Sequence, residues 1–329
     1  MPRNAFPVLA FVLLVSVVAP AQSVVANIPV SGPPSGVAVS PLNNKIYAAV
    51  HDSFTGAQAL AVIDGRTNTQ VATVPLPAAF LVAVNIRTRR VYAAGCNFFQ
   101  QFPAVCTLSV VDGESNELLT TIPISSGAFI GVQGLAVNPV TGRIYVSDAD
   151  NSLIDVINGS TNTIEVSISL GGQQPLGLAV DFVRNRVVVA INGPLMAVID
   201  GRDNVILQRI FVGASNANVA VNPVLKRAYV TNETFGPPST LGVVDLENFT
   251  VVTNVPVGSN AFGVAADPIS GTVFVTDIFG QTIFVIDGRT NQVVATVSVF
   301  GRFIDVNPIR GLAYASDDFA QTIHVISEP

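Results

Sequence analysis

The chain has 329 residues, of which 49% are hydrophobic and only 12% are charged. Its formal net charge is −6, and this acidic balance argues against nucleic-acid binding, because a phosphate backbone is usually met by a basic face. Glycine (26 residues) and proline (21 residues) are frequent, and valine recurs throughout the sequence. Valine favours strands, and many short apolar segments separated by Gly and Pro predict an all-β fold.

The first 21 residues have the pattern of a secretory signal peptide. Arg3 supplies a positive charge, residues 8–18 form an apolar run too short to span a bilayer comfortably, and Ala19-Pro20-Ala21 is typical of a cleavage site. We therefore expect the mature protein to begin at Gln22 and to be extracytoplasmic: periplasmic, attached to the cell surface or secreted. An uncleaved membrane anchor is the alternative. No later segment predicts a transmembrane span.

The mature chain has two cysteines, Cys96 and Cys106, which flank a short insertion. In an oxidising compartment we expect them to form a disulfide. Two buried free thiols are the alternative.

A ten-residue phrase, VNPVTGRIYV at residues 137–146, recurs along the chain. Its variants are centred on Tyr47, Tyr92, Tyr145, Val188, Tyr229, Phe274 and Tyr314. The intervals between these positions are 45, 53, 43, 41, 45 and 40 residues, and all five tyrosines of the chain fall on them. Such self-similarity is typical of repeat architectures, so seven repeats of about 45 residues are predicted.

Each repeat is predicted to contain four strands, called A to D. Strand A is represented by residues 135–137, and an Asn-Pro-x-x-Gly turn, whose glycine tolerates a positive φ, leads to strand B at 143–147. Strand C is represented by 60–63, and an Asp-Gly hairpin turn leads to strand D at 70–74. Such units stack as blades around an axis, so the predicted fold class is an all-β, seven-bladed β-propeller with four-stranded antiparallel blades.

The two ends of the mature chain complement each other. The last repeat stops after its strand C at 323–326, whereas residues 24–30 are similar to the strand D segment at 293–299. We predict that this N-terminal strand completes the last blade and closes the ring, which removes unpaired strand edges. Residues 22–329 would then form a single domain that follows a signal peptide at 1–21.

The fifth repeat contains Tyr229-Val230-Thr231-Asn232, which reads YVTN, and Asn222-Pro223 precedes it. On these motifs the chain resembles the YVTN-family β-propellers, a group that includes surface-layer proteins and YncE-like periplasmic proteins. The resemblance covers residues 23–327 and implies the propeller fold. It implies little about function, because the motifs build blades.

A propeller places its B–C loops and D–A connections on one face, here called the long-loop face. The A–B and C–D turns lie on the other, the short-turn face, where basic residues such as Arg66 and turn aspartates such as Asp64 are expected to pair. Resemblance to other propellers implies that ligands meet the long-loop face. That face is expected to be acidic and rich in phenylalanine, with Arg302 as its clear cation.

The predicted ligand or partner surface on the long-loop face combines carboxylates with aromatic rings. It comprises Asp148, Asp150, Glu233, Phe235, Asp277, Phe279, Asp317, Asp318 and Phe319. The alternative is that the rings tuck between blades and the acids only solvate the rim.

Few residues suggest a metal or a catalytic site. Two acidic pairs, Asp148 with Asp150 and Asp317 with Asp318, could offer oxygen ligands to Ca²⁺, but the spacing of a calcium loop is absent, and no Cys–His cluster suggests zinc. No other cofactor is expected.

The catalytic candidates are His51, Asp52 and Asp305. His51 and Asp52 could act as an acid–base pair at the end of a strand B, although a lone surface histidine is the commoner case. Asp305 is the one acid expected to face the central channel. The second histidine, His324, is expected to be a half-exposed strand residue.

Two functions are compatible with these features. The first is a monomeric, non-enzymatic binding scaffold of the cell envelope or the exterior, which presents an acidic, phenylalanine-containing loop face to a protein or a small ligand. The second is a propeller hydrolase or lyase that acts on a lactone or cyclic ester. It would require carboxylates or a histidine to converge on the channel.

Overall fold

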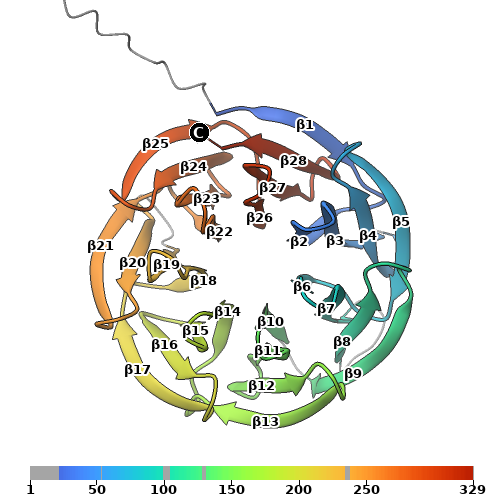
Figure 1. Ribbon diagram of the computed structural model, residues 1–329, viewed down its shortest axis with the longest axis horizontal. Helices are drawn as coiled ribbons and strands as arrows, with labels where there is room; N and C mark the ends of the chain where they lie inside the picture. Colours follow the sequence, from blue (N-terminus) through green and yellow to red (C-terminus); the bar gives the residue numbers. More distant parts are fainter. Residues whose placement is uncertain (1–21, 53, 99–103, 128–130, 234–237, 329) are drawn as a thin grey trace, which may run out of the picture.

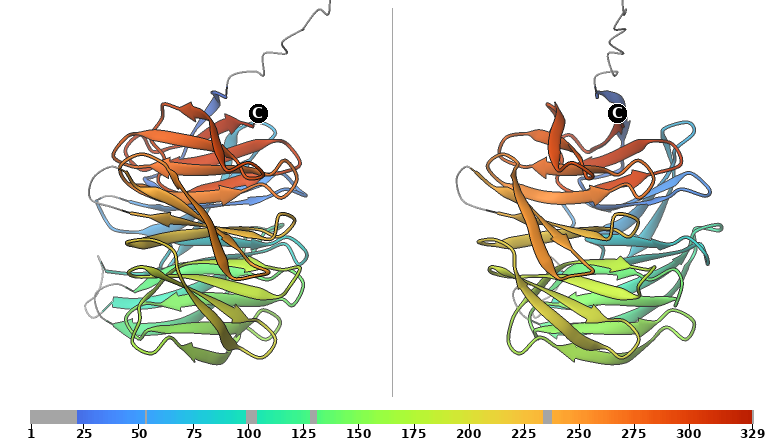
Figure 2. Two further views of the ribbon diagram at one scale, coloured as in Figure 1. Left: turned by 90° about the vertical axis from the view of Figure 1, so that its left-hand side faces the viewer. Right: turned by 60° about the vertical axis from the view of Figure 1, so that its left-hand side comes forward.

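The computed structural model describes residues 22–52, 54–98, 104–127, 131–233 and 238–328. Within these ranges the chain forms 28 β-strands and no helix, and hence no helix with the length and apolar character of a membrane span. The strands make seven four-stranded antiparallel sheets arranged as blades around one axis (Figure 1). In the side views of Figure 2 the strands run from one face of the ring to the other. The predicted seven-bladed β-propeller is confirmed.

In each blade strand A lies nearest the axis and strand D lies at the rim (Figure 1). The first four blades consist of β2 (Pro34–Ser40), β3 (Lys45–His51), β4 (Gln58–Asp64) and β5 (Thr69–Leu76); β6 (Leu81–Asn85), β7 (Arg90–Cys96), β8 (Ala104–Asp112) and β9 (Leu118–Gly127); β10 (Val132–Val137), β11 (Arg143–Asp148), β12 (Leu153–Asn158) and β13 (Thr163–Ser169); and β14 (Pro175–Asp181), β15 (Arg186–Ile191), β16 (Leu195–Asp200) and β17 (Val205–Phe211). The last three consist of β18 (Asn216–Asn222), β19 (Arg227–Asn232), β20 (Thr240–Asp245) and β21 (Thr250–Pro256); β22 (Ala261–Ala266), β23 (Thr272–Asp277), β24 (Thr282–Asp287) and β25 (Gln292–Val297); and β26 (Ile304–Asn307), β27 (Leu312–Asp317), β28 (Thr322–Ser327) and β1 (Val24–Pro29).

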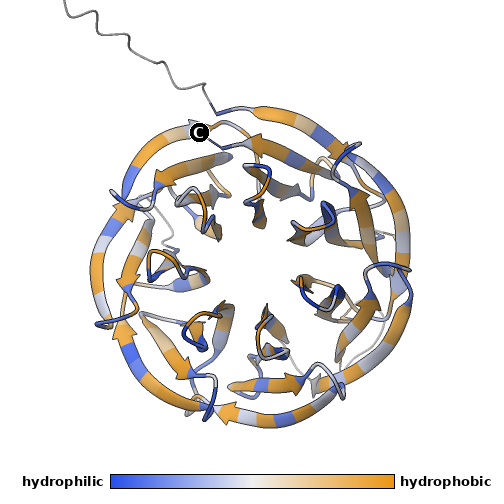
Figure 3. Cartoon of the chain, viewed as in Figure 1, coloured by the Kyte–Doolittle hydropathy of each residue, from blue (hydrophilic) through white to orange (hydrophobic). Residues whose placement is uncertain are grey.

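The hydrophobic core lies between the blades. Strands B and C are buried nearly throughout, whereas residues along strand D, as in β5, alternate between more and less exposed because one side of the strand faces solvent. Figure 3 shows this alternation of hydropathy along the outer strands. In one cluster the buried Tyr47 of the first blade packs with Val82 and Val91 of the second. Neighbouring blades thus share their cores.

Two of the repeated tyrosines, Tyr47 and Tyr229, and the basic residues two positions before them also tie blade to blade. Tyr229 donates a hydrogen bond to the carbonyl of Gly288 in the next blade at 3.3 Å, and Arg227 donates to the same carbonyl at 2.5 Å. Four further basic residues make the equivalent inter-blade contact. They are Lys45, Arg90, Arg143 and Arg186, which donate to the carbonyls of Gly113, Gly159, Gly201 and Leu246.

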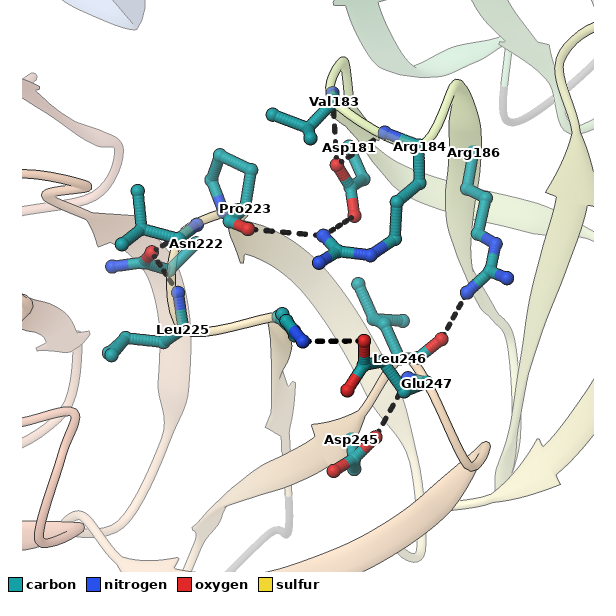
Figure 4. A network of polar contacts seen from close by, with 12 residues as sticks. Asp181, Val183, Arg184, Arg186, Asn222, Pro223, Leu225, Asp245, Leu246 and Glu247 are labelled. Atoms are coloured by element: carbon teal, nitrogen blue, oxygen red, sulfur yellow. Dashed lines mark hydrogen bonds and ion pairs between the residues drawn. The ribbon is translucent and has the colours of Figure 1, made fainter.

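In the part of the chain that the structure describes, no ion pair joins the aspartates of the C–D turns to these cations, so the predicted charge pairing on the short-turn face is not seen for them. Asp64 accepts the N–H of Arg66, and Asp245 accepts the N–H of Glu247, as Figure 4 shows for the second turn. An aspartate that bonds its own turn replaces missing backbone partners. The turn carboxylates therefore shape the turns.

The Asp-Gly turn after Asp64 spans four residues, 65–68. Asn68, the fourth, is left-handed with φ 54°, whereas Gly65 is not. Glycine is needed at 65 because a Cβ there would lie 2.9 Å from the carbonyl oxygen of Asn44. The Asn-Pro-x-x-Gly turn follows its prediction, since Gly142 has φ 74°.

The N-terminal strand closes the ring as predicted. β1 pairs antiparallel with β28, so that Asn27 lies opposite His324 (Figure 1). The His324 ring is buried and contacts Asn27 Oδ1 at 2.7 Å and Asp317 Oδ2 at 3.0 Å. The expectation of a half-exposed histidine was wrong, because β1 covers it.

The predicted disulfide is present. Cys96 in β7 and Cys106 in β8 are directly opposite each other in the second blade and are bonded.

Candidate ligand site at the channel mouth

Three of the predicted partner-face acids are buried at the ends of strands B. Asp148, Asp277 and Asp317 are only 2%, 3% and 6% exposed. Each carboxylate accepts a backbone N–H from the turn that follows its strand. The donors are Asn151, Gly280 and Ala320. These acids hold the B–C turns and present little surface to a partner.

Other predicted surface residues are dispersed. Asp150 accepts the N–H of Gly131 at 2.9 Å. Phe279 and Phe319 are 64% and 81% exposed in separate B–C turns. Phe235 lies outside the described residues.

Glu233 and Asp318, by contrast, line a pair of adjoining cavities where the channel opens on the long-loop face. The cavities have volumes of about 280 and 270 Å³ and share Phe80, Gln133 and Arg302. Asp318 lines the first and Glu233 lines the second. We call these two cavities the mouth.

Three phenylalanines lie at the base of the mouth. The ring of Phe303 meets Phe80 edge-on at 5.5 Å between centroids and meets Phe262 edge-on at 5.3 Å. Phe303 also lines a channel cavity of about 270 Å³, so its ring lies between the mouth and the channel. We call Phe80, Phe262 and Phe303 the aromatic plug.

The backbone of Arg302 is fixed beside this plug, just before β26. Its N–H donates to the carbonyl of Ser316 at 2.8 Å, and its carbonyl accepts from Thr276 Oγ1 at 3.0 Å. A Cβ on Gly263 would lie 2.4 Å from that carbonyl oxygen. Glycine in β22 therefore lets the Arg302 segment approach.

The guanidinium of Arg302 lies against the plug. Its Cζ is 5.8 Å from the ring centroids of both Phe80 and Phe262, within the range of cation–π attraction. Its Nη1 contacts Asp318 Oδ2 at 3.1 Å. Its Nε is buried and has no hydrogen-bond partner in the described part of the chain.

The second carboxyl of the mouth differs electrostatically from the first. Burial raises the pKa of Glu233, and the positive charge of Arg302 opposes this effect. Asp318 already pairs with Arg302. Of the two carboxylates of the mouth, Glu233 is therefore the one that a cationic group of a ligand would stabilise more. The mouth thus offers aromatic rings, a donor and a carboxylate within one site.

The three catalytic candidates do not form one unit. His51 lines the first mouth cavity, whereas Asp305 lines the channel cavity. Asp52 accepts the N–H groups of Thr55 and Phe54, and these bonds lower its pKa. Among the described residues no hydrogen bond joins the His51 ring to Asp52, and no three His, Cys, Asp or Glu side chains form a metal-binding group.

These features define the class of the protein, a seven-bladed β-propeller with two adjoining cavities at one end of its channel. Comparison with protein-family models gives no match, and comparison with curated proteins gives no significant relative. Calcium binding stays a prediction. Two of its candidate ligands, Asp148 and Asp317, already accept hydrogen bonds from their own turns.

Proposed function

We propose that this protein is an exported, non-enzymatic binding scaffold that holds a small ligand at the mouth. The observation that carries the proposal is the position of Arg302, whose guanidinium lies on the plug while the residue lines both cavities of the mouth. A guanidinium held in this way can donate hydrogen bonds to a ligand. The signal-peptide pattern supports export, and the YVTN motif supports placement among the YVTN-family propellers.

The expected ligand has an apolar body, a hydrogen-bond acceptor and a cationic group. The body would pack on Phe80, the acceptor would meet the guanidinium of Arg302, and the cation would meet Glu233. The two adjoining cavities, of about 280 and 270 Å³, are each slightly smaller than the lower end of small-ligand sites, roughly 300–1,000 Å³, so the ligand is expected to be small. The ligand class is therefore a small amphipathic amine.

An enzyme acting on a lactone or cyclic ester is the second candidate, and it depends on Asp305. Burial raises the pKa of Asp305 to about 6, which suits an acid–base group. Its two oxygens, however, accept the N–H groups of Val39 and Val306, and His51 lines a different cavity. These contacts favour binding over catalysis.

Differential scanning fluorimetry with small amphipathic amines, matched carboxylates and matched alcohols tests the proposal. An amine at a hundred times its Kd should stabilise the protein by about 2.7 kcal/mol. Glu233→Gln should abolish the effect, and Glu117→Gln, an exposed change on the short-turn face, should retain it. A panel in which no compound stabilises the protein would contradict the proposal. Turnover of lactones that disappears in Asp305→Asn would support the enzyme instead.

A further inference from the structure

Aliphatic side chains stand exposed at one repeated position on the short-turn face. The position lies two residues after the Ser, Asn or Asp that begins each A–B turn, and six of the seven blades have Leu, Val or Ile there. The six are Leu42, Val140, Val183, Val224, Ile269 and Ile309, and their exposures range from 51% to 70%. The second blade has Arg87. The A–B turns surround the axis (Figure 1), so these side chains form a ring, called here the apolar ring.

The turns hold this ring in place. Asn222 Oδ1 accepts the N–H groups of Val224 and Leu225 at 3.0 and 2.9 Å, and Asp181 Oδ1 accepts the N–H of Val183 at 3.1 Å (Figure 4). Asn222 and Asp181 are themselves fully buried. Exposure of the aliphatic tips is thus imposed by the fold.

The cations near the ring are largely engaged. Arg184 pairs with Asp181 at 2.9 Å and donates to the carbonyl of Pro223 in the next blade (Figure 4). Lys226 pairs with Glu247 at 2.6 Å. A chain of net charge −6 with its cations so engaged is poorly suited to an anionic lipid surface. The six ring positions also lack the Trp and Tyr that mark membrane interfaces.

We infer that the apolar ring docks a second copy of this chain, face to face and axis on axis. A two-fold dimer uses the same patch on both partners, and a ring with near-cyclic symmetry lets the tips of one copy enter the gaps of the other. The mouths, with Glu233 and Asp318, then lie at opposite ends, so the acidic sites stay apart. Six side chains that each lose roughly 100 Å² supply about 600 Å² per partner, near the ~800 Å² of a standard interface.

Sedimentation equilibrium of the purified protein from about 1 to 100 µM tests the inference. The ring variant Leu42→Ser/Val224→Ser/Ile269→Ser is compared with Val71→Ser/Val252→Ser/Val294→Ser on the outer strands. The control residues have similar exposures of 55%, 46% and 53%. We expect a wild-type dimer, a dissociation constant at least tenfold higher in the ring variant, and less than a twofold change in the control.

Two results would overturn the inference. They are a wild-type monomer at the highest concentration and a ring variant that dimerises like the wild type. If the wild-type monomer also cosediments with phosphatidylglycerol vesicles, the ring is assigned to lipid. If the triple variant does not fold, Val224→Asp alone provides the same comparison, because that side chain is 67% exposed and its removal opens no core cavity.

Discussion

The carboxylate of Asp305 accepts a hydrogen bond from the N–H of Val39 at 2.8 Å, which ties β26 of the last blade to β2 of the first. β1 closes the last blade at the rim by pairing with β28, while Asp305 joins the first and last blades beside the channel. The seam of the ring, where the first and last blades meet, is thus held by strand pairing at the rim and by the Asp305 hydrogen bond beside the channel.

Asp305 should make stability depend on pH. Burial raises its pKa from 3.8 to about 6, so the native state binds this proton more tightly than the unfolded state does. The stabilising contribution is complete below about pH 4 and is lost as the pH rises through 6. We expect urea unfolding to show wild type losing roughly 1–2 kcal/mol relative to Asp305→Asn between about pH 4 and 7.5.

Comparing the wild type with Asp305→Asn isolates the contribution of the Asp305 carboxyl, because the other acids are the same in both proteins. Acids with lowered pKa values affect stability in the opposite direction. Backbone hydrogen bonds lower the pKa of Asp245 and of Asp287, so their contributions are lost at low pH in both proteins. The asparagine can still accept the N–H of Val39. Parallel pH profiles for the two proteins would show that Asp305 is not responsible.

Replacing His324 should lower the free energy of unfolding far more than replacing His51. His324→Ala would leave the buried Asp317 without one of its partners and weaken the contact with Asn27 in β1. We expect chemical denaturation to show a loss of roughly 2–4 kcal/mol. His51→Ala, the matched control, should change stability by less than about 0.5 kcal/mol. Equal effects of the two changes would contradict the role given to the seam.

The inter-blade contact at Gly288 should not tolerate a side chain. A Cβ there would lie 2.6 Å from both the carbonyl oxygen of Gly271 and the hydroxyl of Tyr229. Gly288→Ala should therefore lower the free energy of unfolding by roughly 1–3 kcal/mol. In Tyr229→Phe/Gly288→Ala the total loss should be less than the sum of the single losses, because one clash is removed. Additive losses would rule out the contact.

The disulfide should stabilise the second blade. Cys96→Ser/Cys106→Ser opens a loop with a sequence separation of 10 residues, and the chain-entropy model gives a loss of roughly 2–3 kcal/mol. Thermal unfolding of this variant and of the wild type, both without reductant, measures the loss. Equal midpoints would mean that β7 and β8 hold this loop unaided.

The seven blades and the closing strand could be predicted because the sequence repeats them, and the disulfide because the chain has only two cysteines. A tyrosine that returns about every 45 residues marks strand B in five blades, and residues 24–30 are similar to a strand D elsewhere in the chain. An aspartate also repeats at the end of strand B, at Asp148, Asp277 and Asp317. These residues were predicted to be surface charges. An aspartate that recurs at the end of strand B in three blades indicates a turn-capping role.

The aromatic plug could not be predicted in the same way. Phe80 and Phe262 occupy the same repeat position and Phe303 lies one place later, but most blades lack a phenylalanine there, and the three rings meet only because the propeller brings distant segments together. Each phenylalanine alone is indistinguishable from a core residue. The apolar ring was visible in the repeats, but its exposure depends on buried side chains such as Asn222 that turn the tips outward.

Titration calorimetry of the most stabilising amine against four proteins tests the central claim most directly. The proteins are the wild type, Arg302→Gln, Glu233→Gln and Glu117→Gln. Binding at the mouth predicts that the Arg302 and Glu233 variants each raise Kd at least tenfold, about 1.4 kcal/mol, while Glu117→Gln leaves it unchanged. Equal affinities in all four proteins would place the ligand elsewhere and contradict the assignment of the mouth as the binding site.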